Sequence, residues 1–302
     1  MIARAPGKLV LSGAYSVLEG APALVAAVDR YVIADGSRTS ALVTEEILAA
    51  MSQGALDRVP WFDASQLRAR LPDGTTRKLG LGSSGAILVA SIASVIAEQV
   101  TDEVALRDAV FRLALAAHRQ AQPLGSGIEI PAITYGGIVR CHLRPAGGIE
   151  TSPYTLPAGL SVEVFACESS ASTGGLLEKV LHLRETDEAK YRSLIEAAAT
   201  GARSAISARD AESFVHALSF QTDALSTLGR LAQAPIVINE VAELRGLAAA
   251  EQANFGPSGA GGGDIALWVG TERPSDSFLA RAASLGLEPL PIALGAPGVK
   301  IL

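Results

Sequence analysis

The sequence predicts an α+β fold in two halves. In the first half, short apolar runs come before two long helical segments, whereas the second half opens with a strand-like run and continues mostly in helices. A stretch rich in proline and glycine, residues 145–159, separates the halves. We therefore expect helices packed on mostly antiparallel strands in two domains, residues 1–150 and 151–302.

Apolar patterning places the elements of the first half. Strands are expected at residues 8–11, 23–28, 31–34, 67–71, 75–79 and 133–143. Asp73-Gly74 is a hairpin signal between the fourth and fifth of these strands. Helices are expected at residues 84–99 and 103–120.

The second half is expected to contain a small sheet and more helices. Strands are expected at residues 160–167, 264–269, 287–294 and 299–302. Helices are expected at residues 173–184, 188–203, 211–228, 236–250 and 275–285. Ser275 is expected to cap the last helix.

Composition narrows the class of protein. The chain has 302 residues, of which 49% are hydrophobic and 19% charged, values typical of a folded globular protein. A net charge of -6 argues against nucleic acid or an anionic membrane surface as the main partner. The first residues already belong to a motif and no run of about 18 apolar residues occurs, so we expect a cytoplasmic protein without a membrane span.

Cysteine and histidine offer no metal pattern. Cys141 and Cys167 are expected to be buried thiols in a reducing compartment. The four histidines are scattered along the chain, so a structural zinc site is not expected.

Two glycine-rich segments are the most informative features. Residues 256–264 hold five glycines directly before an apolar strand, which indicates either tight turns or a ligand lying on main-chain N–H groups. Residues 78–86 lead into a buried helix, whose N-terminal N–H groups and positive dipole end bind anions. Ser83 and Ser84 are expected either to cap this helix or to reach a phosphate or a metal.

Two further segments carry ionisable groups. Ala5-Pro-Gly-Lys8 is expected to form a turn that presents the Lys8 ammonium to a phosphate or a hydroxyl, although a solvated turn lysine would look the same. Gly125-Ser-Gly-Ile-Glu129 is expected to place a carboxylate just beyond a tight bend.

These four segments resemble the motifs of the GHMP kinases, the family of galacto-, homoserine, mevalonate and phosphomevalonate kinases. Ala5-Pro-Gly-Lys8, with Gly13 and Tyr15, resembles the first motif. Residues 80–86 resemble the ATP-phosphate loop, and residues 258–264 resemble the third motif. The resemblance covers nearly the whole chain. It implies a ribosomal-protein-S5-like, ATP-binding N-terminal domain and a ferredoxin-like C-terminal domain.

The resemblance also implies roles for single residues. ATP and Mg²⁺ are the implied cofactors, and Lys8 and Glu129 the implied catalytic residues. The residues implied to bind the nucleotide are Gly80, Gly82, Ser83, Ser84 and Gly85, with Ser84 also at the metal. The residues implied to bind the acceptor are Tyr15, Ser126, Gly127, Ser172, Ser258, Gly259, Gly261 and Gly262.

Within the family, three details are most similar to phosphomevalonate kinases and imply 5-phosphomevalonate as the acceptor. They are Asp264 at the end of the third motif, Ser170-Ala-Ser-Thr173 before apolar positions, and Gly125-Ser-Gly-Ile-Glu with Tyr135-Gly-Gly137. Mevalonate or another small alcohol is the alternative acceptor, and an inactive nucleotide-binding regulator is a further alternative. Monomer and homodimer are both compatible with the sequence.

Glu129 departs from the family pattern, which usually has Asp in this stretch. The extra methylene moves the carboxylate by one C–C bond, and reaction geometry is sensitive to displacements of about 1 Å. Glu129 is therefore interpreted either as a catalytic carboxylate that pairs with Lys8 or as a structural one. Arg30, Arg140 and Lys179 are candidates for binding an anionic acceptor.

Overall fold

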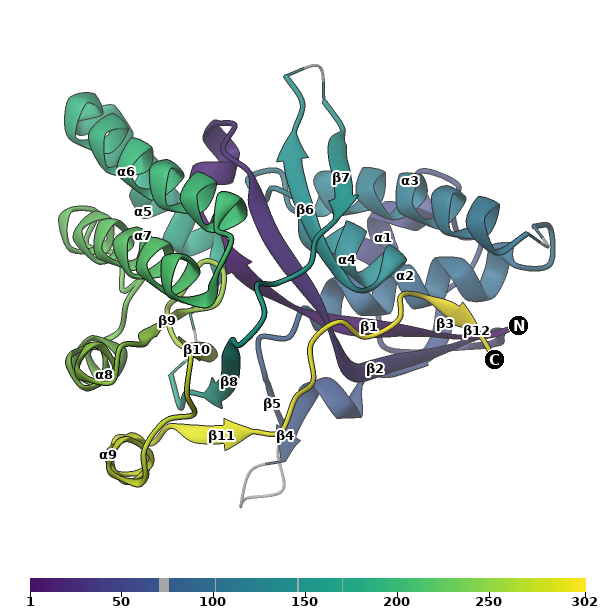
Figure 1. Cartoon of the computed structure of the whole chain (residues 1–302). Helices are drawn as coiled ribbons and strands as arrows, with labels where there is room; N and C mark the ends of the chain where they lie inside the picture. Colours follow the sequence, from purple (N-terminus) through teal and green to yellow (C-terminus); the bar gives the residue numbers. More distant parts are fainter. Residues whose placement is uncertain (71–75, 101, 146, 170) are drawn as a thin grey trace. The chain divides into compact units, whose positions relative to one another are not determined.

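The computed structural model describes residues 1–70, 76–100, 102–145, 147–169 and 171–302 (Figure 1). The chain forms two compact units that interleave along the sequence. Unit 1 consists of Met1–Leu9, Val25–Val139 and Ala293–Leu302, and unit 2 of Val10–Leu24 and Arg140–Ile292. The expected domain boundary at residue 150 stays a prediction.

Six strands form the largest sheet, in the order β12-β1-β2-β6-β7, with β3 paired to β2. Strands β1, β2 and β6 contribute residues to both units. The strands are β1 (Ile2–Ser12), β2 (Ala23–Thr39), β3 (Pro60–Asp63), β6 (Ile138–Leu143), β7 (Ile149–Pro153) and β12 (Lys300–Ile301). The pairing of β1 with β12 is antiparallel and joins Ala3 to Ile301.

In unit 1 the helices gather around α2, as Figure 1 shows. Helix α2 (Ser83–Ile96) has eleven buried residues, because nearly every position is small or apolar. The helices that pack on it are α1 (Glu45–Ser52), α3 (Glu103–Ala121) and α4 (Glu129–Tyr135). The side chains of Thr44 and Asp102 cap α1 and α3, so polar residues mark where these helices begin.

Unit 2 contains a four-stranded antiparallel sheet in the order β11-β8-β10-β9. Its strands are β8 (Ser161–Ala166), β9 (Asn254–Pro257), β10 (Ile265–Gly270) and β11 (Glu288–Leu290). Helices α8 (Asn239–Ala250) and α9 (Asp276–Ser284) supply apolar side chains to a core with this sheet. At its centre Phe278 makes edge contacts with Phe165, Phe255 and Trp268, at ring distances of 5.9, 5.2 and 4.6 Å.

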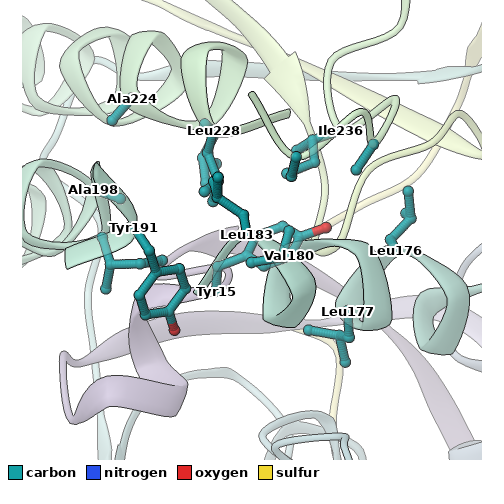
Figure 2. Packing of buried hydrophobic residues seen from close by; sticks show 14 residues of the cluster. Tyr15, Leu176, Leu177, Val180, Leu183, Tyr191, Ala198, Ala224, Leu228 and Ile236 are labelled. Carbon is teal, nitrogen blue, oxygen red and sulfur yellow. The ribbon is translucent and has the colours of Figure 1, made fainter. Parts of the chain in front are cut away.

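A second apolar cluster of unit 2 joins three long helices (Figure 2). The helices are α5 (Thr173–Thr186), α6 (Glu188–Ser207) and α7 (Ala211–Leu231). Tyr15, from the segment before the short 3₁₀ helix η1 (Ser16–Glu19), inserts its ring among Val180, Leu183 and Leu228. Tyr15 is thereby fixed to the helices of its own unit.

The structure confirms the predicted α+β class and the expected helices, with boundary shifts of a few residues. Ser275 caps α9, as expected, by accepting a hydrogen bond from the Phe278 N–H. The expected hairpin strands appear as β4 (Arg68–Arg70) and β5 (Thr76–Lys78). Asp73 and Gly74 between them lie outside the described residues, as does Ser170.

Three expectations are wrong. The strand expected at residues 299–302 does not join the small sheet of the second half, because β12 pairs with β1 in the largest sheet. Pro6-Gly7 forms no turn, and β1 runs through both residues. Proline has no backbone N–H to donate to a neighbouring strand. The pairing with β12 involves Ala3 and Arg4, so it requires no N–H from Pro6. Residues 133–135 are helical and belong to α4, which Gly136 ends at a φ of 79°.

Several elements had no counterpart in the sequence-based expectations, namely α1, β3, β7 and β9. Both cysteines are buried, as expected. Within the described part of the chain, no helix combines the length and the apolar character needed to cross a membrane.

Replacing Phe278 by alanine is expected to destabilise unit 2 strongly. The side chain is fully buried, and its removal costs about 3–5 kcal/mol in a packed core. Urea unfolding in a Trp61→Phe background, where the emission comes from Trp268 beside Phe278, measures the loss. Phe220→Ala is the matched control, because Phe220 is 46% exposed. Equal unfolding midpoints for the two variants would contradict the assigned core.

Candidate functional site

The N-terminus of α2 has the geometry of an anion site. Gly82 is the N-cap residue at a φ of 74°, and no side chain caps the helix there. Gly80 also has a positive φ, of 70°. Ser83 and Ser84 are therefore the first two helical residues and not the cap, which removes simple capping as their explanation. The N–H groups of this first turn point out of the helix at its positive end.

Lys8 reaches this helix end from β1. Its N–H donates a 2.9 Å hydrogen bond to the carbonyl of Leu81. A Cβ atom at Gly82 would lie 2.8 Å from Lys8 Cγ and 2.7 Å from Lys8 Cε. The alkyl chain of Lys8 therefore lies directly against Gly82, a position that a strand provides and a solvated turn would not.

Glu129 also lies beside the first turn of α2. It is the first residue of α4, and its side chain is 25% exposed. A Cβ atom at Gly85 would lie 3.6 Å from Glu129 Cγ and 3.0 Å from the end of Ile133. The stem of the carboxylate thus packs on the first turn of α2.

A residue that sequence reasoning missed lies behind Glu129. His118 Nε2 is 3.6 Å from Glu129 Oε1, and the histidine is 5% exposed. A single histidine in a helix gives no sequence signal for such a contact. The turn that joins α3 to α4 creates it.

The remaining predicted residues of unit 1 lie in that turn. Ser126 Oγ accepts a 3.5 Å hydrogen bond from the Ile128 N–H, and the Gly127 carbonyl accepts one from the Ile130 N–H. These contacts shape the turn and orient the start of α4. The structure therefore brings Lys8, residues 80–85 and Glu129 together within unit 1.

The glycine-rich segment 256–264 is packed tightly within unit 2. Ser258 Oγ bonds both the N–H and the carbonyl of Val10, each at 3.1 Å. The Tyr15 hydroxyl donates a 2.7 Å hydrogen bond to the Ala260 carbonyl. Burial raises the pKa of Tyr15, which keeps this hydroxyl protonated as a donor.

Close packing explains three of the glycines. A Cβ atom at Gly261 would lie 2.0 Å from the Ile236 carbonyl oxygen, and one at Gly263 would lie 2.2 Å from that of Ser169. At Gly262 the nearest atom would be Ala171 Cβ, at 2.5 Å. All three also have positive φ, so the segment can follow this path only with glycine there.

Gly259 differs from these three, since its nearest neighbour would be 3.7 Å away. Ser172 caps α5 by accepting a hydrogen bond from the Gly175 N–H. Unit 2 therefore brings together the predicted residues Tyr15, Ser172, Ser258, Gly259, Gly261 and Gly262, with Tyr15 in the core.

The three candidate cations for an acidic acceptor lie in different settings. Arg30 is 3.5 Å from Asp29, and Lys179 Nζ donates to the Gln233 carbonyl. Arg140 is exposed on β6. Among the described residues, no group of three or more histidine, cysteine, aspartate or glutamate side chains is placed to hold a metal.

Two curated kinases are similar to the chain along nearly their whole length. The chain is 26% identical to the phosphomevalonate kinase of Streptomyces sp. (strain CL190), over 99% of this chain and 98% of that protein. It is 28% identical to the mevalonate kinase of Archaeoglobus fulgidus, over 95% and 99%.

One solved structure with the same fold is the Streptococcus pneumoniae phosphomevalonate kinase in complex with phosphomevalonate and AMPPNP. It has a TM-score of 0.77 and 19% identity, over 97% of this chain and 99% of that chain. No family model matches the chain. The chain therefore resembles the GHMP kinases along nearly the whole length of both relatives and shares the fold of the solved phosphomevalonate kinase.

Proposed function

We propose that the chain is an ATP-dependent kinase of the mevalonate pathway that converts 5-phosphomevalonate to 5-diphosphomevalonate. The observation that carries the proposal is the placement of Lys8 beside Gly82 and of Glu129 beside Gly85, at the uncapped N-terminus of α2. The matches to a phosphomevalonate kinase and a mevalonate kinase support the pathway. We also propose that the enzyme acts in the cytoplasm, as a monomer or a homodimer.

The first turn of α2 suits the phosphates of ATP. Its N–H groups lack a side-chain cap, and the positive φ angles at Gly80 and Gly82 bring the backbone close without side chains in the way. Ser84, at the second helical position, offers a hydroxyl to Mg²⁺. There Ser84 would help to hold Mg²⁺, which when bound would neutralise charge at the phosphates.

Lys8 and Glu129 act on the transfer itself. An acceptor oxygen forms a bond to the γ-phosphorus while the bond from that phosphorus to the bridging oxygen of ADP breaks. Lys8 stabilises the charge that spreads over the γ-phosphoryl oxygens. Glu129 orients Lys8 or accepts the proton of the acceptor, and the released proton ends on its carboxylate or in water.

A mevalonate kinase is the second candidate function. The 28% identity to the Archaeoglobus fulgidus mevalonate kinase is the observation that favours it. The two candidates differ in chemistry, since mevalonate presents an alcohol whereas 5-phosphomevalonate presents a phosphate to the γ-phosphorus. Glu129 as a base matters more for the alcohol, because a phosphate monoester has a second pKa of about 6 and is mostly ionised at neutral pH.

Lys8→Met is expected to lower kcat by about 10²- to 10³-fold while leaving ATP binding nearly intact, because its charge acts mainly on the transition state. A coupled ADP-release assay gives kcat, and calorimetry gives the Kd for ATP. Lys300→Met, at an exposed lysine of β12, is the control and should keep full turnover. Unchanged turnover in Lys8→Met would remove Lys8 from the mechanism.

Gly82→Ala is expected to lower kcat by at least ~10-fold, since a misplaced catalytic group costs about that or more. The new Cβ would collide with the Lys8 side chain. Gly54→Ala is the matched control, because Gly54 has a φ of 73° and nothing within 4 Å of its Cβ position. Both variants introduce alanine at positive φ, and only the first displaces Lys8. Equal kcat values in the two variants would show that the collision has no catalytic consequence.

The acceptor is tested by kinetics on 5-phosphomevalonate, mevalonate, homoserine and galactose. We expect kcat/KM for 5-phosphomevalonate to exceed that for mevalonate by at least ~10³, because groups that bind the phosphate stay unpaired with the smaller substrate. Methionine at Arg30, Arg140 or Lys179 should reduce this ratio for at least one of the three positions. Arg192→Met, on the surface of α6, should not change it. A preference for mevalonate would assign the second candidate function.

A further inference from the structure

His118 and Glu129 form a buried contact that the chain builds with a short turn. His118 lies in the last turn of α3, and its carbonyl accepts a 2.7 Å hydrogen bond from the N–H of Gln122. The chain then turns through Gly125, where a Cβ atom would lie 3.4 Å from His118 Nε2. The turn passes close to the imidazole and brings Glu129 to the same nitrogen, with Nε2 and Oε1 3.6 Å apart.

The surroundings of the imidazole decide which nitrogen carries the proton. Nδ1 is buried and has no hydrogen-bond partner among the described residues. Within the described ranges Nδ1 is unpartnered in either tautomer, but a proton on Nδ1 would also leave the lone pair of Nε2 facing the Glu129 carboxylate. A proton on Nε2 faces the carboxylate of Glu129. The geometry therefore favours Nε2 as the nitrogen that carries the proton toward Glu129, with the histidine as donor and the carboxylate as acceptor.

Glu129 is enclosed on two sides by groups of different kinds. Gly85 of α2 contacts the apolar stem of its side chain, and His118 faces its carboxylate. The stem contact limits where the side chain lies, and the imidazole limits how the carboxylate turns. A glutamate has three side-chain torsions to fix, so a polar partner at its end reduces the number of accessible orientations.

We propose that His118 is a positioning residue that holds the Glu129 carboxylate at the N-terminus of α2. The inference rests on the proposed function, in which Glu129 takes part in phosphoryl transfer. The Nε2–O distance of 3.6 Å is longer than an ordinary hydrogen bond, and such contacts often shorten when substrates bind. His118 acts only through Glu129 and touches neither substrate.

A double-mutant cycle tests the proposal, with His118→Leu, Glu129→Gln and the double variant. His118→Leu removes the donor and is expected to lower kcat about 10-fold with KM for ATP within about twofold, as for residues that orient a ligand or catalytic group. His118→Gln places an amide N–H near the position of Nε2 and is expected to restore most of that loss. In the Glu129→Gln background, His118→Leu is expected to cause no further loss.

Two kinetic results would overturn the proposal. An equal fold-loss from His118→Leu in both backgrounds would show that His118 acts independently of Glu129, through packing alone. An unchanged kcat in Glu129→Gln would show that no catalytic carboxylate exists for His118 to position.

A second measurement needs no turnover and therefore separates this inference from the proposed function. Nitrogen-15 spectra of histidine-labelled protein report the tautomer of His118. We expect the Nε2–H form in the wild type and a changed Nε2 signal in Glu129→Gln. A proton on Nδ1, or an identical His118 signal in the two proteins, overturns the proposal. Failure to phosphorylate any of the four acceptors would instead count against the proposed function alone.

Discussion

The close approach of β1 to the segment before α2 is the constraint on which the unit 1 site depends. A Cβ atom at Gly7 would lie 2.8 Å from the Leu81 carbonyl oxygen, and the next residue, Lys8, donates its N–H to that same oxygen. Two backbones meet here with no room for a side chain between them. Gly82 repeats the condition one residue later, against the side chain of Lys8. The lysine is thereby placed by main-chain contacts and does not depend on a flexible loop.

Burial of α2 makes this placement rigid. The helix is surrounded by α1, α3 and α4, and its first turn is held by the same packing as its middle. A shift of the helix end would have to move the core of unit 1, which close packing resists. Phosphoryl transfer depends mainly on positioning and electrostatics, so a rigid helix end with fixed N–H dipoles is a suitable base for it. His118 extends the same principle to Glu129, because the imidazole limits how its carboxylate turns.

Glycine content alone did not show why each glycine-rich segment requires glycine. Around α2, glycine allows the backbone to meet Lys8 and leaves the helix N-terminus open. In the segment 256–264, Gly261 and Gly263 press against carbonyl groups of their own unit, so packing already requires them. Both cases satisfy the same sequence rule, which states that glycine clusters need positive φ or close approach. The identity of the approaching group comes only from the fold.

The sequence-based expectations were accurate where local interactions decide the structure and failed where contacts between residues distant in sequence decide it. Helix starts such as Ser275 were predicted because capping is local. The turn expected at Pro6-Gly7 was wrong because pairing and packing with distant residues keep those two residues extended. The contact of His118 with Glu129 was invisible for the same reason, since a turn between two helices creates it.

The role of Glu129 depends on the proton that the acceptor brings. An alcohol must lose its proton as the new bond forms, and a carboxylate beside the reacting oxygen assists this step. A phosphate acceptor arrives largely ionised, so the same carboxylate has little proton to remove and its negative charge would repel the acceptor. Such a site gains from a carboxylate that is held away from the acceptor and turned toward a cation or a donor. The buried imidazole of His118 meets the need for such a donor, because it faces the Glu129 carboxylate from α3.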